Sequence, residues 1–133
     1  MTVTLKWYDD AQTTLIYEFK GAWTWSDYDE ARAACRRLLD TVDYGIDQIY
    51  DFTHAPVPPS GSVSKFWQVA TTKHENTSGL IVVVGNNKLT QMLANTVGSL
   101  INRAIRNFDI SYVTNHDAMD EHLQKRRAIH RAD

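Results

Sequence analysis

The stretch GLIVVVG at residues 79–85 decides the fold class, because it is a continuous β-branched run bounded by two glycines. It lacks the alternation of a strand with one face in water, and it is typical of a central strand buried on both faces. Strands of this kind belong to parallel sheets whose connecting helices cover the sheet. We therefore expect an α/β protein with this stretch as a central strand.

The sequence on both sides of this stretch alternates between strand-like and helix-like patterns. IDQIYDF at residues 46–52 reads as a strand that ends near Thr53, and apolar residues at positions 63, 66, 67 and 70 indicate a short helix. After the central strand, Asn86 or Asn87 caps a long apolar stripe from Leu89 to Ala104. DISYVT at residues 109–114 is the last strand, and a helix follows it, opened by Asn115 or Asp117.

The first forty residues predict a hairpin and a helix. VTLKWY and TTLIYEF alternate apolar and polar residues on either side of the short connection DDAQ. Ser26 and Asp29 resemble a capping pair, and the apolar spacing after them predicts a helix to about Val42. The expected order is β-β-α-β-α-β-α-β-α in a single domain over residues 1–133, with a mostly parallel sheet and an N-terminal antiparallel hairpin.

The composition is that of an ordinary globular domain. The chain has 133 residues, 43% hydrophobic residues and a net charge of −2, so nucleic acid is not an expected partner. One cysteine, Cys35, excludes an internal disulfide and fits a reducing compartment. The first ten residues lack a signal-peptide pattern, and LIVVV is too short to cross a bilayer. We expect a cytoplasmic protein without a membrane span.

Four segments together resemble one known family. LIYEFKGAWTWSDYDEARAACRRLL resembles its second strand and first helix, and IDQIYDFTHAPVPPSG its third strand and the loop to a serine–glycine pair. GLIVVVGNNKLTQMLANTVGSL and ISYVTNHDAMDEHL resemble its later strands and helices. By their order and spacing, these segments are similar to the STAS domain and its SpoIIAA-like relatives, the anti-sigma-factor antagonists, over nearly the whole chain.

This resemblance implies a non-enzymatic bacterial signalling module that binds a protein partner, either a kinase of the anti-sigma type or another regulator. In phosphorylated members, the serine before the glycine accepts phosphate from the partner kinase. That serine corresponds to Ser60, and Asp51 corresponds to the aspartate that ends the third strand. Pro58 and Pro59 stand where the family has an acidic and a small hydroxyl residue, so any phospho-switch here is degenerate. The expected partner-binding residues are Thr53, His54, Gly61, Lys65 and Phe66.

The serines of this loop have two interpretations on physical grounds. A phosphate on Ser60 or Ser62 would lie at the N-terminus of the helix that follows, where free N–H groups and the helix dipole favour an anion. Alternatively, Ser60 or Ser62 is the N-cap of that helix, which stabilises it by about 1 kcal/mol. Ser60 is the stronger phosphorylation candidate because it alone precedes the glycine.

The tryptophans suggest an alternative function. Trp23 and Trp25 follow a strand. Trp67 lies in the helix after the loop that contains Ser60 and Gly61 (the serine loop). With Phe66, they could line an apolar pocket, so the alternative is a small-molecule or lipid carrier of SpoIIAA-like architecture. The other interpretation is that most of them complete the edge of the core. The long apolar stripe of residues 89–104 is open to two interpretations, a homodimer surface or ordinary core.

No pattern supports catalysis or a bound cofactor. Nucleophile-elbow, Walker and dinucleotide-binding motifs do not occur, and the five histidines contain no ligand pair on one helix face. Cys35 lies on the apolar side of its predicted helix, where a thiol is inert core. We therefore expect neither enzyme activity nor a metal.

Overall fold

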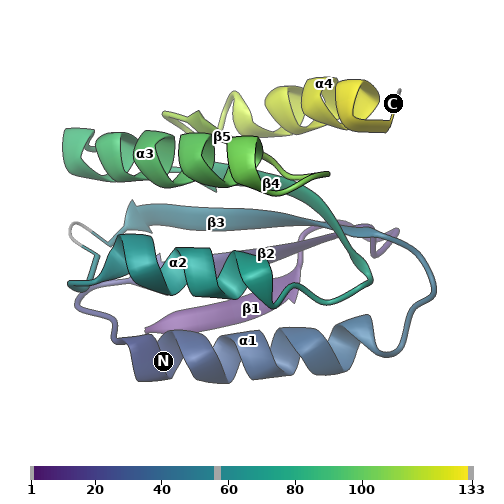
Figure 1. The fold of residues 1–133 in the computed structure, drawn as a ribbon, viewed down its shortest axis with the longest axis horizontal. Coiled ribbons are helices and arrows are strands. Elements are labelled where there is room, and N and C mark those ends of the chain that lie inside the picture. Colours follow the sequence, from purple (N-terminus) through teal and green to yellow (C-terminus); the bar gives the residue numbers. More distant parts are fainter. Residues whose placement is uncertain (1, 56–57, 132–133) are drawn as a thin grey trace.

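The computed structural model describes residues 2–55 and 58–131, which form five strands and four helices around one sheet (Figure 1). The strands are β1 (Val3–Trp7), β2 (Thr14–Lys20), β3 (Ile46–His54), β4 (Thr77–Val84) and β5 (Asp109–Val113). The helices are α1 (Trp25–Leu39), α2 (Ser62–Thr71), α3 (Lys88–Ala104) and α4 (Met119–Arg131). The predicted element order is confirmed.

The sheet follows the chain order, β1-β2-β3-β4-β5, with the β1–β2 pair antiparallel and every other pair parallel. The register aligns Tyr17, Tyr50, Val83 and Tyr112 in one row across β2 to β5. Adjacent residues of a strand point to opposite faces. The residues next to this row in each strand therefore form a second row on the opposite face of the sheet. The expected α/β class, parallel sheet and N-terminal hairpin are therefore present.

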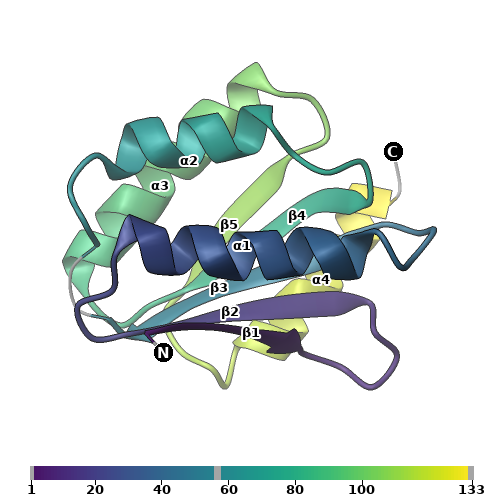
Figure 2. The same cartoon turned by 90° about the horizontal axis from the view of Figure 1, so that it is seen from below.

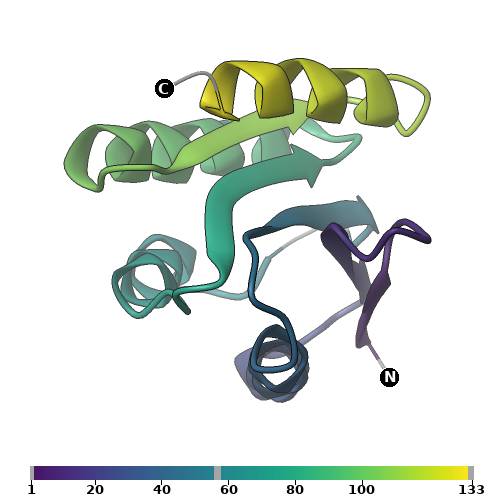
Figure 3. The same cartoon turned by 90° about the vertical axis from the view of Figure 1, so that its right-hand side faces the viewer.

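The two rows pack against different helices. Figure 3 shows α4 on one side of the twisted sheet and α1 and α2 on the other. Under α4 lie Ile49 and Val82, which pack with Leu123 of that helix, and all three are almost fully buried. On the opposite face, α1 covers an aromatic cluster of β2 and β3 that includes Tyr17 and Tyr50, and α3 packs against β5.

The start of α1 differs from the predicted one. Thr24 is the N-cap: its side chain accepts a hydrogen bond from the Asp27 N–H, and the Asp27 side chain accepts one from the Thr24 N–H. Ser26, the predicted cap, lies inside the helix, and the helix ends at Leu39 rather than near Val42. Several residues of this stretch suit a cap, and Thr24 is the one used.

The start of β4 and the course of α3 depend on two features of the sequence. Gly79 has φ +88°, and a Cβ there would lie 1.9 Å from the Asn107 carbonyl oxygen, so this position requires glycine. Asn87 is the N-cap of α3, in agreement with the prediction. The apolar stripe of α3 divides: Val97 and Ile101 are buried, whereas its large exposed members are Leu89, Met92 and Leu100.

Candidate functional site

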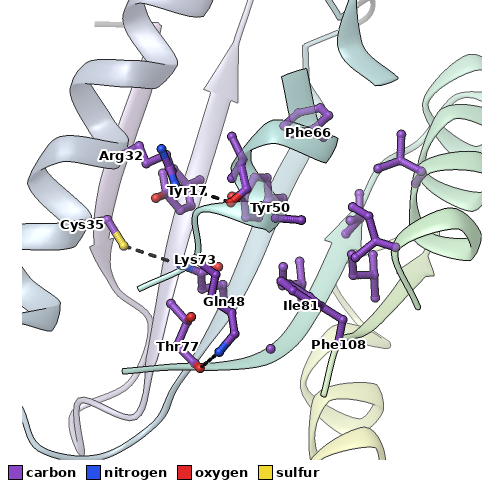
Figure 4. Close-up of a pocket in the computed structure, with 18 of the residues that line it drawn as sticks. Tyr17, Arg32, Cys35, Gln48, Tyr50, Phe66, Lys73, Thr77, Ile81 and Phe108 are labelled. Carbon is purple, nitrogen blue, oxygen red and sulfur yellow. Dashed lines mark hydrogen bonds between the residues drawn. The ribbon is translucent and has the colours of Figure 1, made fainter. Parts of the chain in front are cut away.

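A cavity of about 110 Å³ lies beneath α2, between that helix and the sheet. Its floor includes Tyr17, Gln48, Tyr50 and Ile81 from three neighbouring strands, and Figure 4 shows these side chains around a common space. The walls come from α1, α2 and α3, and Phe108 from the segment before β5 also contributes. Aromatic and aliphatic side chains make up most of this lining.

Polar contacts hold α2 over this space. Arg32 and Arg36 of α1 donate to the carbonyl oxygen of Thr72, the C-cap of α2, over 3.1 and 2.9 Å. At the other end of the helix, Lys65 forms a salt bridge of 2.8 Å with Asp29 of α1. Because cations at a helix C-terminus complement its dipole, the two arginines stabilise α2 as well as position it.

The buried phenol and thiol groups in and beside the cavity wall are neutral. The hydroxyl groups of Tyr28 and Tyr50 share a hydrogen bond of 2.7 Å, and burial raises the pKa of both. Burial also raises the pKa of the Cys35 thiol, whose sulfur accepts a hydrogen bond from Gln48 at 3.6 Å. The thiol is therefore protonated and buried, which agrees with the predicted core cysteine.

The end of the cavity near the C-terminus of α2 is basic. Arg32, Arg36, Lys73 and His74 all contribute to the lining, which contains no aspartate or glutamate among the residues described. The nearby carboxylate of Asp40 is paired with His74 over 2.7 Å. Arg32 and Arg36 also act to lower the pKa of Cys35, against the larger effect of burial, so their positive potential extends to the cavity wall.

The serine loop lies at the carboxyl edge of the sheet, next to the beginnings of α1 and α3 (Figure 2). Its carbonyl at Ser60 accepts a hydrogen bond of 2.9 Å from the Trp25 indole, which fastens the loop to α1. Ser60 is exposed, whereas Ser62 is buried and its hydroxyl donates to the Pro59 carbonyl over 2.7 Å. Two positions of this loop, 56 and 57, lie outside the described residues.

The N-cap of α2 is Gly61, in a left-handed conformation with φ 79° and without a side-chain hydrogen bond. The interpretation of Ser60 or Ser62 as the N-cap is therefore wrong. The chain turns at the glycine, and this turn directs the Ser62 hydroxyl back to the loop. The first turn of α2 consequently lacks a side-chain cap.

A shallow groove borders the serine loop and was not predicted from the sequence. Pro58, Gly61 and Val63 line one side, and Leu89 and Leu93 of α3 line the other. Val63 and Leu89 are exposed apolar side chains. Their positions in the sequence fit the core stripes of two helices, so only the tertiary arrangement reveals that they meet at the surface.

The other predicted partner-binding residues lie around this edge in different environments. His54 is exposed and Thr53 is partly buried, with its N–H and hydroxyl both donating to the Asp51 carboxylate. The same carboxylate lies 2.7 Å from His116 Nε2, a pair that the sequence analysis missed. No local signal links these two residues, because they are 65 positions apart.

Lys65 and Phe66, also predicted to bind a partner, point toward α1 and the sheet. Lys65 pairs with Asp29, and the Phe66 ring lies 5.8 Å from the Tyr28 ring and 6.2 Å from the Tyr50 ring. Phe66 thus lines the cavity beneath α2, as does Pro58 at its loop end.

The three tryptophans proposed for a ligand pocket are not among the described residues that line the cavity. Trp23 is buried in the aromatic cluster, and its ring meets that of Trp25 edge-on at 5.0 Å. Trp67 packs with the α2–α3 cluster. Their positions agree with the alternative that they complete the core edge.

In residues 2–55 and 58–131, no helix is long and apolar enough to cross a membrane, and no group of three or more His, Cys, Asp or Glu is suited to hold a metal. Comparison of the chain with protein-family models, curated proteins and solved structures found no significant match.

Proposed function

We propose that this protein is a STAS-like regulatory module that binds a protein partner through the groove beside Ser60. The observation that carries the proposal is the exposed serine–glycine turn, which stands next to two exposed apolar side chains, Val63 and Leu89. Exposed apolar side chains gathered at one edge are typical of a protein interface. The loop is also fixed to α1 by the Trp25 indole, so the surface is preorganised for binding.

The order of the elements supports the STAS-like part of the proposal. The family resemblance assigned Ser60 to the loop between the third strand and the second helix, and Ser60 lies there in an exposed position. Asp51, matched to the aspartate of the same strand, is buried and organises Thr53 and His116 by hydrogen bonds. In this proposal, Asp51 shapes the edge of the docking surface.

Ser60 is the residue at which phosphorylation would regulate docking. Its exposure makes the hydroxyl accessible, whereas the Ser62 hydroxyl is buried and already bonded to Pro59. A phosphate on Ser60 would add negative charge beside the groove and next to the uncapped first turn of α2. Such a charge would weaken contact with an apolar partner surface. It would interact favourably with the free N–H groups at the start of the helix.

The alternative function of a lipid carrier has less support. Sites that enclose a drug-sized ligand have volumes of roughly 300–1,000 Å³, and the cavity beneath α2 has about 110 Å³. The tryptophans that suggested a carrier lie outside its lining. Docking at the serine loop is therefore the preferred function.

Affinity capture with matched variants tests this proposal. The full chain would be immobilised and exposed to lysate of the source organism, and mass spectrometry would identify the bound protein and any phosphate on Ser60. Leu89→Glu places a charge in the groove, and Ile129→Glu places one on α4; these side chains are 51% and 54% exposed. One protein should bind the wild type and Ile129→Glu but not Leu89→Glu.

The Ser60 variants separate docking from its regulation. Ser60→Asp should weaken capture of that protein, and Ser60→Ala should leave both the fold and capture unchanged. If the two variants capture the protein equally, the proposed phosphorylation switch is contradicted, but docking through the groove is not. If Leu89→Glu captures the protein as well as the wild type does, docking through this groove is contradicted.

A further inference from the structure

Apolar side chains stay exposed along most of the length of α3. Leu89, Met92 and Leu100 are 51%, 60% and 46% exposed, and Thr96 between them is also exposed. Their spacing of three, four and four residues places these four side chains, the α3 stripe, on one face of the helix. A rise of about 1.5 Å per residue makes the stripe about 16 Å long. Because Leu89 lines the groove beside Ser60, the stripe continues that groove along α3.

The charged residues along this helix are all positive. None of the 16 aspartates and glutamates of the chain lies in residues 76–108, whereas Lys88, Arg103 and Arg106 do. Lys88 and Arg103 are exposed at the two ends of α3, and neither forms a salt bridge within the described residues. Arg103 follows Thr96 by seven residues, so it lies on the same face as the stripe. The surface thus has an apolar centre and a positive charge at each end.

These charges determine which partner fits the stripe. A second copy of the chain would bring like charges together, since Lys88 of one copy would lie opposite Arg103 of the other in an antiparallel pair of α3 helices. Like charges that meet across an interface oppose association, whereas carboxylates would complement both ends. A stripe with spacings of three and four residues is typical of packing against another helix. The groove at its start also suits the convex side of a helix better than a flat lipid surface.

We propose that the partner segment that docks here is an acidic amphipathic helix. Its apolar side lies along the α3 stripe, and its carboxylates lie near Lys88 and Arg103. This inference rests on the proposed docking at the groove beside Ser60 and specifies the chemistry of the partner. A phosphate on Ser60 would then act directly on docking, because its negative charge would repel an acidic helix.

Two synthetic peptides of about 20 residues, long enough to form a helix, are the probes. Both carry leucine at the first and fourth positions of each heptad, and the flanking positions are glutamate in one peptide and lysine in the other. Fluorescence anisotropy and amide NMR spectra of the full chain would measure their binding. The glutamate peptide should bind saturably, shift the amide signals of the α3 stripe and lose affinity as salt is added. The lysine peptide should bind at least about tenfold more weakly.

Matched variants test the two parts of the surface. Leu100→Ser removes an apolar side chain of the stripe, and Ile129→Ser removes a similarly exposed one from α4. Arg103→Gln removes a charge from the last turn of α3, and Arg37→Gln removes an exposed one from the last turn of α1. Leu100→Ser should weaken binding of the glutamate peptide about fivefold, and Arg103→Gln should weaken it about threefold. The Ile129 and Arg37 variants should bind it as the wild type does.

Several outcomes would overturn the inference. The glutamate peptide might show no saturable binding, the lysine peptide might bind equally well, or Leu100→Ser and Arg103→Gln might behave like their controls. A dimer of the free chain that Leu100→Ser dissociates would assign the stripe to a second copy. Vesicles of anionic phospholipid that bind through the stripe when the glutamate peptide does not would assign it to a lipid surface.

Affinity capture separates this inference from the docking on which it rests. If Leu89→Glu abolishes capture of the partner but Leu100→Ser and Arg103→Gln leave it unchanged, the partner uses the groove alone. The acidic helix is then contradicted, and docking is not. If Leu89→Glu leaves capture unchanged, docking through the groove is itself contradicted.

Discussion

The two faces of the sheet are closed in different ways. On one face, α4 packs directly on the apolar row of Ile49 and Val82, and Arg127 forms a salt bridge of 2.7 Å with the buried Asp47 at the edge of this contact. On the other face, α1 packs closely on the aromatic cluster. Helix α2 contacts this cluster through Phe66 and Val69 but also lies above a cavity, with hydrogen bonds at its C-terminus and in the loop before it.

This difference affects stability. Protein interiors are close-packed, and a gap next to a side chain loses dispersion contacts. A helix fixed by specific polar contacts over such a gap therefore gives up stability that direct packing would provide. The α4 face is closed by direct packing, whereas the α2 side of the other face leaves a cavity and a groove.

The largest expected effect is on the α4 face. Arg127→Met leaves the buried Asp47 without its arginine and should reduce the free energy of unfolding by about 3 kcal/mol, measured by chemical denaturation. Lys125→Met on the same helix is the control. It breaks an exposed pair with Glu121 and should cost less than about 0.5 kcal/mol. Similar losses in the two variants would show that Arg127 does not fasten this face.

The aromatic cluster on the other face should make the stability of the protein fall at alkaline pH. Burial raises the pKa of Tyr17, Tyr28 and Tyr50, so these phenols stay protonated in the folded state at pH values where the unfolded chain loses protons. The folded state then binds more protons, and stability falls as pH rises above the ordinary tyrosine pKa of about 10. Each phenol contributes a slope of about 1.4 kcal/mol per pH unit.

Phenylalanine variants check this origin of the slope. The double variant Tyr28→Phe/Tyr50→Phe should lose most of the decline between about pH 10 and 11 in denaturation experiments. Tyr44→Phe, which removes an exposed phenol, should retain it. An unchanged slope in the double variant would contradict the assignment to the buried cluster.

Two neighbouring valines of β4 compare the packing of the faces with the same substitution. Val82→Ile adds a methyl group under α4, where packing is complete, and should cost about 1–2 kcal/mol. Val83→Ile adds it on the cavity side and should change stability by less than about 0.5 kcal/mol. Thermal and chemical denaturation would measure both. Equal costs would mean that the cavity side is packed as closely as the α4 side.

The type and order of the strands and helices could be predicted from the sequence because local patterns determine them. The β-branched run at residues 81–84, the alternating hairpin strands and the cap at Asn87 each act within a few residues, and all of them agree with the structure. The predicted N-cap of α1 was wrong because Thr24 and Ser26 are chemically equivalent as local signals.

The site was less predictable because it depends on contacts between distant residues. The serine loop was located correctly, but the apolar spacing of α2 and α3 gives no sign that Val63 and Leu89 stay exposed and meet. Arg36 and Lys73 are ordinary surface residues in the sequence, and they converge only because α2 ends beside α1. Periodicity predicts which residues are apolar, but not where a helix stands away from the sheet.

The smallest expected effect tests whether the serine loop tolerates negative charge. Ser60 precedes the N-cap of α2, and the first turn of that helix lacks a side-chain cap. Ser60→Asp should therefore stabilise the protein by about 0.5 kcal/mol at low ionic strength, through the N–H groups and the helix dipole, and salt should reduce this gain. Ser60→Asn has nearly the same shape without the charge, so it should show no salt-dependent gain in denaturation experiments. If both variants behave alike at low and high salt, the first turn of α2 does not attract an anion at position 60, and a phosphate there would act on the partner alone.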